Sequence, residues 1–227
     1  MNHDPVVEEP PYDRIFLRPI ANPLPMAFVG LGGATVALSA LQLGWVPTDE
    51  STKVGLLVLL VAVPLQALAS VMGFLGRDPV GATGAGTLAV SWAAIGSVTA
   101  LSAPGARSQV LGLALFYLAT ALLVSAIVAM TGKVLPALVL TVTTVRLTLT
   151  GVYEYYGGSG WMHAAGWVGV ALAAVAVYAV LALELEGARR RPVLPTLRIG
   201  AARRAVVGDG LTTVGPAERE AGVRNQL

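Results

Sequence analysis

Cysteine is absent from the sequence, and histidine occurs only twice, at His3 and His163. The lack of cysteine excludes disulfide bonds, thiolate metal ligands and a cysteine nucleophile. Two histidines so far apart are too few for a convincing zinc site. The HExxH motif of zinc proteases and the GxSxG motif of serine hydrolases do not occur either. We therefore expect a protein that is not an enzyme and that holds no metal ion or cofactor.

Charged residues are also scarce. They make up 12% of the chain, whereas soluble domains carry about 25%. Hydrophobic residues account for 55%, and the mean hydropathy is +0.71. Most charges lie near the two ends of the chain and in short segments between apolar stretches of about twenty residues, the length that spans a bilayer. This pattern predicts an all-α integral membrane protein.

Six apolar stretches, separated by turn-forming or polar residues, predict six transmembrane helices. The expected helices cover residues 24–45, 54–75, 80–101, 110–130, 134–153 and 163–183. Only the segments "GRDP" and "TGK" separate the second helix from the third and the fourth from the fifth. We therefore expect these two pairs to form tight antiparallel hairpins.

Lysine and arginine are distributed unevenly between the two sides of the predicted membrane domain. If the N-terminus is cytoplasmic, the outer side carries only Lys53 and Arg107. The positive-inside rule then predicts that both termini lie in the cytoplasm. We expect a multi-pass protein of the plasma membrane. The expected parts are a cytoplasmic N-terminal segment at 1–21, a six-helix transmembrane domain at 22–186 and a basic cytoplasmic tail at 187–227.

Neither end of the chain carries a recognisable signal or binding module. The first twenty residues are acidic and proline-rich and lack the apolar core of a cleavable signal peptide. The arginines of the tail would lie beside anionic lipid. Nucleic-acid binding is disfavoured, because interleaved aromatic residues are missing. The glycine, threonine and charge content of the tail favours a solvated segment with little order.

The segment "GATGAGT" at residues 81–87 is glycine-rich, but it lacks the lysine and the preceding strand of a P-loop. Its small residues Gly81, Ala85 and Ala89 recur every four positions on one helix face, which favours close packing between membrane helices. Similar rows are formed by Gly30 and Ala34, by Gly33 and Ala37, and by Ala165, Gly169 and Ala173.

Two prolines stand at the start of the first apolar run, in "ANPLPMAFVGLGG" at residues 21–33. Amides in the first turn of a helix have no intrahelical partner, so Pro23 and Pro25 remove no hydrogen bond there. Asn22 is a suitable capping residue, whose side-chain oxygen can accept a hydrogen bond from the Leu24 amide. The free amides and the positive end of the helix dipole would suit a small anion. A plain interfacial cap explains the same residues.

Three blocks of sequence, taken in order, resemble the acetate uptake transporter family, which includes bacterial succinate–acetate permeases and fungal acetate and ammonia-export relatives. The first block, "ANPLPMAFVGLGG", is similar to the NPxPLGL signature of that family. The second is "LQALASVMGFLGRDPVGATGAGTLAVSW", in which Gln66, Gly81, Thr83 and Trp92 match. The third, "HAAGWVGVALAAVAVYAVLALELEG", is similar to the last helix of the family. The resemblance implies six helices, transport of acetate or similar small monocarboxylates, and a ring-shaped homohexamer with one pathway in each protomer.

The same resemblance implies a narrow apolar constriction. Aligned on the family, its residues in this chain are Leu31, Leu88 and Val142. Two positions that are aromatic in the family are aliphatic here, so the constriction is expected to stay dry but to lose bulk and a hydroxyl. Asp78 and Pro79 replace the Asn-Thr of the turn between the second and third helices. These departures affect the expected choice of solute more than the fold.

No aspartate or glutamate lies deep within a predicted helix, so a carboxylate proton relay of the kind used by pumps is not expected. A carboxylate that crosses an apolar constriction loses its hydration, which is costly unless the charge is neutralised. We therefore expect acetate to cross with a proton, most simply as the neutral acid. Asn22, Gln66 and Thr83 are candidates for polar contacts on the pathway, and the resemblance adds Trp92. Gln66 and Thr83 instead serve only helix packing in the alternative interpretation.

Arg146 lies within the fifth predicted helix, where a charge is costly and normally faces a cavity or a partner. Three interpretations are open: an anion attractor on the pathway, a side chain that extends to the interface, or an ion pair with Glu154. An arginine on the pathway would repel ammonium, the alternative solute suggested by the fungal relatives. A non-transporting membrane scaffold is the alternative from a different functional class.

Overall fold

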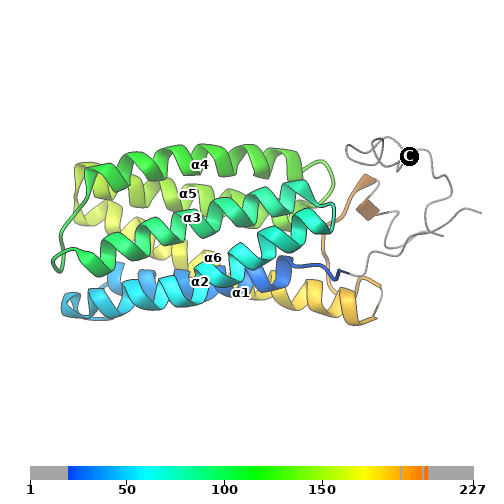
Figure 1. Cartoon of the computed structure of the whole chain (residues 1–227), viewed down its shortest axis with the longest axis horizontal. Helices are drawn as coiled ribbons and strands as arrows, with labels where there is room; N and C mark the ends of the chain where they lie inside the picture. The colour runs from blue at the N-terminus through cyan, green and yellow to red at the C-terminus, as the bar shows by residue number, and fades with distance from the viewer. Residues whose placement is uncertain (1–19, 190, 201, 204–227) are drawn as a thin grey trace, which may run out of the picture.

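The computed structural model describes residues 20–189, 191–200 and 202–203, which contain six α-helices (Figure 1). The helices are α1 (Leu24–Gln42), α2 (Ser51–Leu75), α3 (Pro79–Leu101), α4 (Gln109–Ala129), α5 (Val134–Tyr156) and α6 (Ser159–Arg189), with a short 3₁₀ helix, η1 (Thr48–Glu50), before α2. Each α-helix is long and apolar enough to cross a membrane. The expected all-α architecture with six membrane spans is confirmed.

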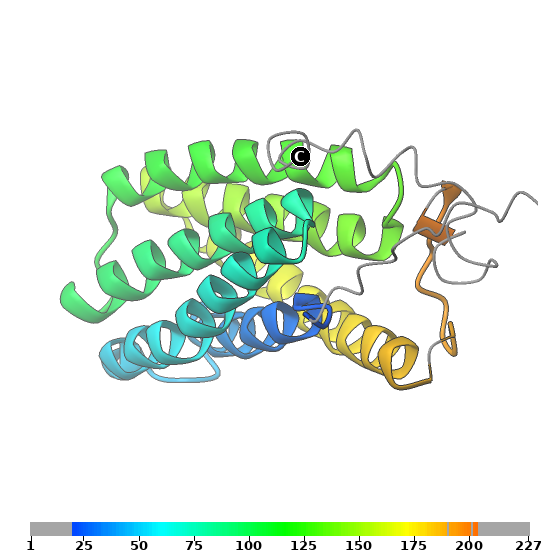
Figure 2. The same ribbon diagram turned by 45° about the vertical axis from the view of Figure 1, so that its right-hand side comes forward.

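The helices form a closed ring in chain order, because each packs against the next and α6 packs against α1 (Figures 1 and 2). Short turns at residues 76–78 and 130–133 join α2 to α3 and α4 to α5, which confirms the expected tight hairpins. Buried apolar side chains from all six helices fill the interior of the ring in one main cluster. Helices α1, α3 and α5 run in the same direction. On each of them, a higher residue number therefore means a position further from the end of the ring where α1 begins.

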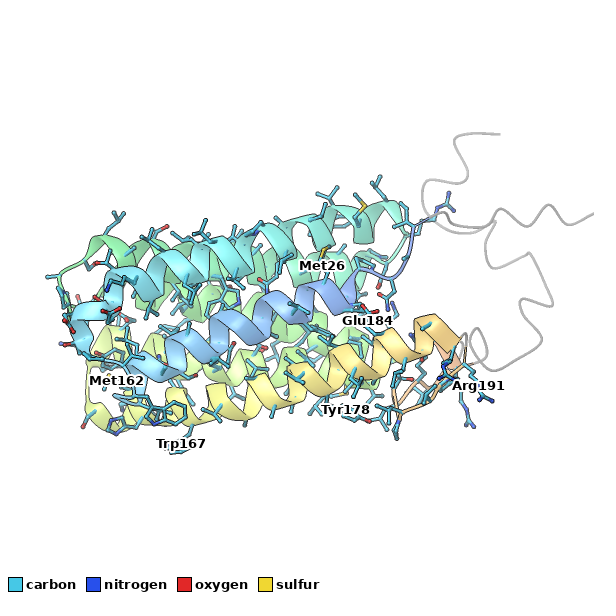
Figure 3. The ribbon with its side chains drawn as sticks, turned by 90° about the horizontal axis from the view of Figure 1, so that it is seen from below. Met26, Met162, Trp167, Tyr178, Glu184 and Arg191 are labelled. Atoms are coloured by element: carbon cyan, nitrogen blue, oxygen red, sulfur yellow. The ribbon has the colours of Figure 1, made fainter. Side chains whose placement is uncertain are left out.

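The two ends of the ring differ in character. We term the end where α1 begins and α6 ends the terminal end, and the other the loop end. Figure 3 shows Glu184 and Arg191 at the terminal end and Met162 and Trp167 at the loop end. At the loop end, Trp45 and Trp167 make an edge-to-face contact with ring centroids 5.9 Å apart, and both are more than half exposed. Exposed tryptophans are typical of the boundary between membrane and water.

Helix α6 is longer than the hydropathy pattern indicated. It runs from Ser159 to Arg189, whereas the apolar stretch predicted a helix over residues 163–183. Its first turn contains glycine and its last two turns contain charged residues. Such residues end an apolar run without ending a helix, so a pattern based on hydropathy detects only the part of α6 that is expected to lie in the membrane.

Residues 191–200, which we term the C-terminal segment, cross from the end of α6 to the α4–α5 turn (Figure 2). The Ile199 amide donates to the Gly132 carbonyl at 3.0 Å, and the Tyr178 hydroxyl donates to the Pro195 carbonyl at 3.0 Å. The expectation of a solvated tail with little order is therefore wrong for these residues. Backbone pairing with a distant turn leaves no trace in composition. Residues 204–227 of the predicted tail lie outside the described residues.

Two glycines bring α2 and α3 into backbone contact. A Cβ added to Gly55 would lie 2.6 Å from both the Ala100 nitrogen and the Gly96 oxygen. A Cβ added to Gly96 would lie 2.9 Å from the Gly55 oxygen. These distances leave no space for a methyl group, which is the close approach that small residues allow between membrane helices.

We expect Gly55→Ala to lower the melting temperature of the protein purified in detergent, because α2 and α3 must move apart at a cost of about 1–3 kcal/mol. Gly187→Ala is the matched control. A Cβ there meets nothing within 4 Å, and alanine favours a helix over glycine by about 1 kcal/mol. Equal melting temperatures for Gly55→Ala and the unmodified protein would show that the contact between α2 and α3 is adjustable.

Candidate functional site

A cavity of about 250 Å³, which we term the vestibule, opens at the terminal end of the ring. Its wall is formed by the start of α1, the α2–α3 turn, the start of α5, the end of α6 and the C-terminal segment. The lining residues are Ile20, Ala21, Asn22, Pro23, Leu24, Gly73, Gly76, Asp78, Lys133, Pro136, Leu183, Thr196 and Arg198. The C-terminal segment is therefore part of the mouth of the ring.

The N-terminus of α1 faces the vestibule. The Leu24 amide donates a hydrogen bond to Asn22 Oδ1 at 3.1 Å, which confirms the predicted contact. Pro23 is the residue before the helix and Pro25 lies in its first turn, where neither proline removes a needed amide. Asn22 and Pro23 both line the cavity, so the positive end of the α1 dipole points towards this space.

Two basic side chains of the vestibule are paired with carboxylates. Lys133 Nζ lies 2.6 Å from Asp78 Oδ2, and Arg198 donates to both oxygens of Glu186. Asp78 also accepts a hydrogen bond from the Gly81 amide at 3.2 Å, which caps α3. The vestibule is thus polar, but its charges largely cancel.

A much smaller cavity of about 20 Å³, with an almost wholly apolar lining, follows the vestibule. Phe28, Leu88 and Leu140 are among its lining residues, and we term these three the constriction. The residues that line both cavities are Leu24, Lys133 and Pro136. A space of this size holds about one water molecule, which is less than acetic acid needs. The constriction is closed in this structure.

The predicted constriction residues occupy different places. Leu88 is 1% exposed and lines the small cavity. Leu31 is fully buried in the core cluster, about one turn beyond Phe28 on α1. Val142 is only partly buried and packs against the edge of that cluster, whereas Leu140 lines the cavity from α5. Leu140 rather than Val142 therefore lines the small cavity from α5, because successive residues of a helix face different surroundings, and the role of Val142 stays a prediction.

Arg146 lies inside the ring and is 1% exposed. Its Nη2 donates to Ser39 Oγ at 3.1 Å, to Gln42 Oε1 at 3.3 Å and to the Thr35 carbonyl at 3.4 Å. Its guanidinium carbon lies 5.4 Å from the centroid of the Trp92 ring. Arg146 therefore reaches from α5 to both α1 and α3. We term these five residues the arginine cluster.

The surroundings of Arg146 contradict two of its three interpretations. Burial excludes a side chain that extends to the interface. Glu154 accepts a hydrogen bond from the Ser108 amide at 2.7 Å, and no carboxylate pairs with Arg146 in the described part of the chain. The role of an anion attractor stays a prediction.

Three polar atoms of the arginine cluster are buried without a hydrogen-bond partner: Arg146 Nε, Trp92 Nε1 and Thr35 Oγ1. Gly169 on α6 provides the room for the arginine. A Cβ at Gly169 would lie 2.6 Å from Arg146 Nε and 2.1 Å from Ser39 Oγ. Gly169, one of a row of small residues predicted to serve helix packing, therefore also makes room for the Arg146 side chain.

Two further candidates lie outside the vestibule, the constriction and the arginine cluster. Gln66 is fully buried, and its Nε2 donates to the Ala27 carbonyl at 3.4 Å, which matches the alternative interpretation as a packing residue between α1 and α2. Thr83 is exposed on the outer face of α3, whereas Leu88 faces inwards. The prediction that Thr83 contacts a solute inside the protomer is therefore not supported. Each step along a helix turns the side chain by about 100°, so neighbouring residues face different surroundings.

The sequence alone does not single out several residues of the site. Phe28 lies about one turn from Leu31 on the same helix face, so helical periodicity is the signal that could have identified it. Lys133 lies in a turn and Arg198 in the C-terminal segment, and no sequence pattern indicates that they share one cavity. Their proximity follows only from the fold.

No family model and no curated protein sequence matches the chain. The structure is similar to that of the bacterial acetate channel SatP, with a TM-score of 0.69 and 22% sequence identity. The similarity covers 78% of this chain and 99% of that channel. The chain therefore has the fold of a bacterial acetate channel, which is the fold that the resemblance of its sequence motifs implied.

Proposed function

We propose that the protein is a membrane channel or transporter for acetate and similar small monocarboxylates, and that the solute crosses together with a proton. The observation that carries this proposal is the order of layers along the ring: the polar vestibule, the apolar constriction and the arginine cluster. The fold shared with an acetate channel supports the choice of solute.

Three parallel helices supply the last two layers in the same order. The pairs of constriction and cluster residues are Phe28 and Thr35 on α1, Leu88 and Trp92 on α3, and Leu140 and Arg146 on α5. With a rise of 1.5 Å per residue, the arginine cluster lies about 6–10 Å beyond the constriction. A solute that enters from the vestibule would meet the layers one after another.

The constriction favours a neutral solute. An ionised carboxylate would lose its hydration among Phe28, Leu88 and Leu140, whose side chains offer it no partner, at a cost of several kcal/mol. Lys133 also lines this small cavity, but it is already paired with Asp78. The described carboxylates, such as Asp78 and Glu186, lie near the ends of the ring rather than at the constriction. A side-chain relay is therefore not expected to carry the proton, and acetate crosses as acetic acid.

Export of ammonia or ammonium is the second candidate, and a non-transporting scaffold is the third. Arg146 disfavours ammonium, because a buried guanidinium repels a cation strongly in surroundings of low dielectric constant. A buried charge without a counter-ion lowers stability. A scaffold has no need of such a residue, so Arg146 disfavours this third candidate.

We further propose that both termini are cytoplasmic, that the protein lies in the plasma membrane, and that it forms a homohexamer with one pathway in each protomer. The positive-inside rule supports this orientation. The described basic residues near the terminal end are Arg77, Lys133, Arg189, Arg191, Arg198 and Arg203, and those near the loop end are Lys53 and Arg107. In such an assembly Thr83 would face lipid or a neighbouring protomer.

Proteoliposomes that contain the purified protein are expected to take up labelled acetate faster as the external pH falls. Added acetate is also expected to dissipate an imposed pH gradient, because each acetate carries a proton. Liposomes without protein measure the passive flux of acetic acid, which is subtracted. Electrogenic acetate uptake that is insensitive to pH would contradict proton coupling, and uptake of ammonium without uptake of acetate would favour the second candidate.

A further inference from the structure

We propose that the arginine cluster is an internal binding site for a small carboxylate anion, with hydrogen-bond donors from Arg146, Trp92 and Thr35. The inference rests on the proposed function and adds a site for its solute beyond the constriction. The solute crosses the constriction as the neutral acid and binds here as the anion, with its O–H proton passing to water. A guanidinium favours this ionised form of the acid.

The cluster lacks a counter-ion. A buried charge lowers stability by several kcal/mol unless an opposite charge pairs with it. The acceptors of the guanidinium are a hydroxyl on Ser39, an amide oxygen on Gln42 and a backbone carbonyl. These groups are neutral and leave the charge uncancelled. The described chain contributes no carboxylate to Arg146, so a bound anion would supply the missing charge.

The cluster also has hydrogen-bond donors in excess. Arg146 Nε and Trp92 Nε1 can only donate, and both are buried without a partner, as is the hydroxyl of Thr35. Each of these residues is at most 1% exposed. Most buried polar groups in proteins have partners, so three exceptions on residues gathered around one arginine point to a ligand. A guanidinium N–H, an indole N–H and a hydroxyl suit the two oxygens of a carboxylate.

The enclosure of the cluster limits the size of the ligand. The backbone of Gly169 lies against one side of Arg146, and the ring of Trp92 lies over the guanidinium. A carboxylate would have to replace the contact of Gln42 Oε1 with Arg146. Gln42 has a second partner, since its Nε2 donates to Thr150 Oγ1 at 3.4 Å. A longer chain would have to displace more of these contacts than acetate does, so the site favours the smallest carboxylates.

Two substitutions each remove one polar atom that has no partner in this structure. Trp92→Phe deletes Nε1 but keeps an aromatic ring, and Thr35→Val deletes the hydroxyl but keeps the side-chain shape. We expect each to weaken the binding of sodium acetate about tenfold, the effect of one hydrogen bond to a charged group. Without acetate, the melting temperature of Thr35→Val should stay within a few degrees, because its hydroxyl has no partner. Trp92→Phe also removes part of a fully buried ring, so the rise in melting temperature is measured for each variant from its own value without acetate. Trp167→Phe, at the exposed Trp167 of the loop end, is the matched control.

Binding is measured on the full-length protein in detergent near neutral pH, as the rise in melting temperature with sodium acetate compared with sodium chloride. Acetamide, which has a similar shape but no charge, should give no rise. Unchanged acetate binding by Trp92→Phe and Thr35→Val would overturn the site, and so would equal rises with acetamide and acetate. If proteoliposomes still transport acetate in that case, the proposed function stands. If acetate produces neither a thermal shift nor transport, the proposed function fails as well.

Discussion

Replacing Leu88 by alanine is expected to let longer carboxylates through the constriction. Leu88 is buried and lines the cavity of about 20 Å³ from α3. Its truncation would enlarge this space by most of a leucine side chain. Uptake of butyrate or succinate relative to acetate should therefore rise at least about tenfold, since each methylene that a pocket newly accepts changes selectivity by 10–200-fold. Uptake of labelled acids into proteoliposomes measures the ratio.

Val90→Ala provides the comparison for Leu88→Ala. Val90 lies on the same helix, but it is 58% exposed and faces away from the ring interior. Its truncation should leave the ratio of butyrate to acetate unchanged. Since a buried leucine truncated to alanine costs about 2–5 kcal/mol, the melting temperature of Leu88→Ala is measured beside its transport. A folded Leu88→Ala protein with the original selectivity would exclude Leu88 from the narrowest part of the pathway.

Arg146→Gln should weaken the apparent affinity for acetate and reduce discrimination against ammonium. Glutamine keeps an N–H donor but loses the charge, so the affinity for acetate should fall about tenfold or more. Ammonium should compete better, because the repulsion that excludes it is gone. The melting temperature is measured beside transport, because the change removes a buried charge without a counter-ion but also leaves the acceptors of Arg146 with fewer donors. Acetate uptake at varied concentration, with and without ammonium, gives both values.

Glu154→Gln is the control for this change. The Glu154 side chain holds the Ser108 amide at the loop end, and glutamine retains an oxygen that can accept the same bond. Its acetate affinity should match that of the unmodified protein. If Arg146→Gln also transports acetate with unchanged affinity, Arg146 has no role in attracting the anion.

The number of helices and the two tight hairpins could be predicted because they depend on local properties. An apolar run of sufficient length forms a helix in a membrane whatever its neighbours are. The contact between Asn22 and the Leu24 amide is local too and was predicted correctly. The C-terminal segment was not, because its partners lie in a turn more than sixty residues earlier.

The surroundings of Arg146 depend on contacts between distant parts of the chain. Its acceptors Ser39 and Gln42 are 107 and 104 residues away. One signal was nevertheless available, since Thr35, Ser39 and Gln42 are spaced four and three residues apart. This spacing forms a polar stripe along one face of an otherwise apolar helix. A polar stripe on one membrane helix and a single arginine on another together indicate a contact that neither indicates alone.

The space beside Gly169 also restricts the order in which substitutions could accumulate during evolution. A methyl group at position 169 would lie 2.6 Å from Arg146 Nε, so arginine at 146 is compatible only with a chain that already has glycine at 169. The opposite order is unhindered, because a glycine at 169 does not require an arginine. Homologous sequences should therefore include chains with Gly169 and an uncharged residue at position 146. Chains with arginine at 146 and a larger residue at 169 should be missing.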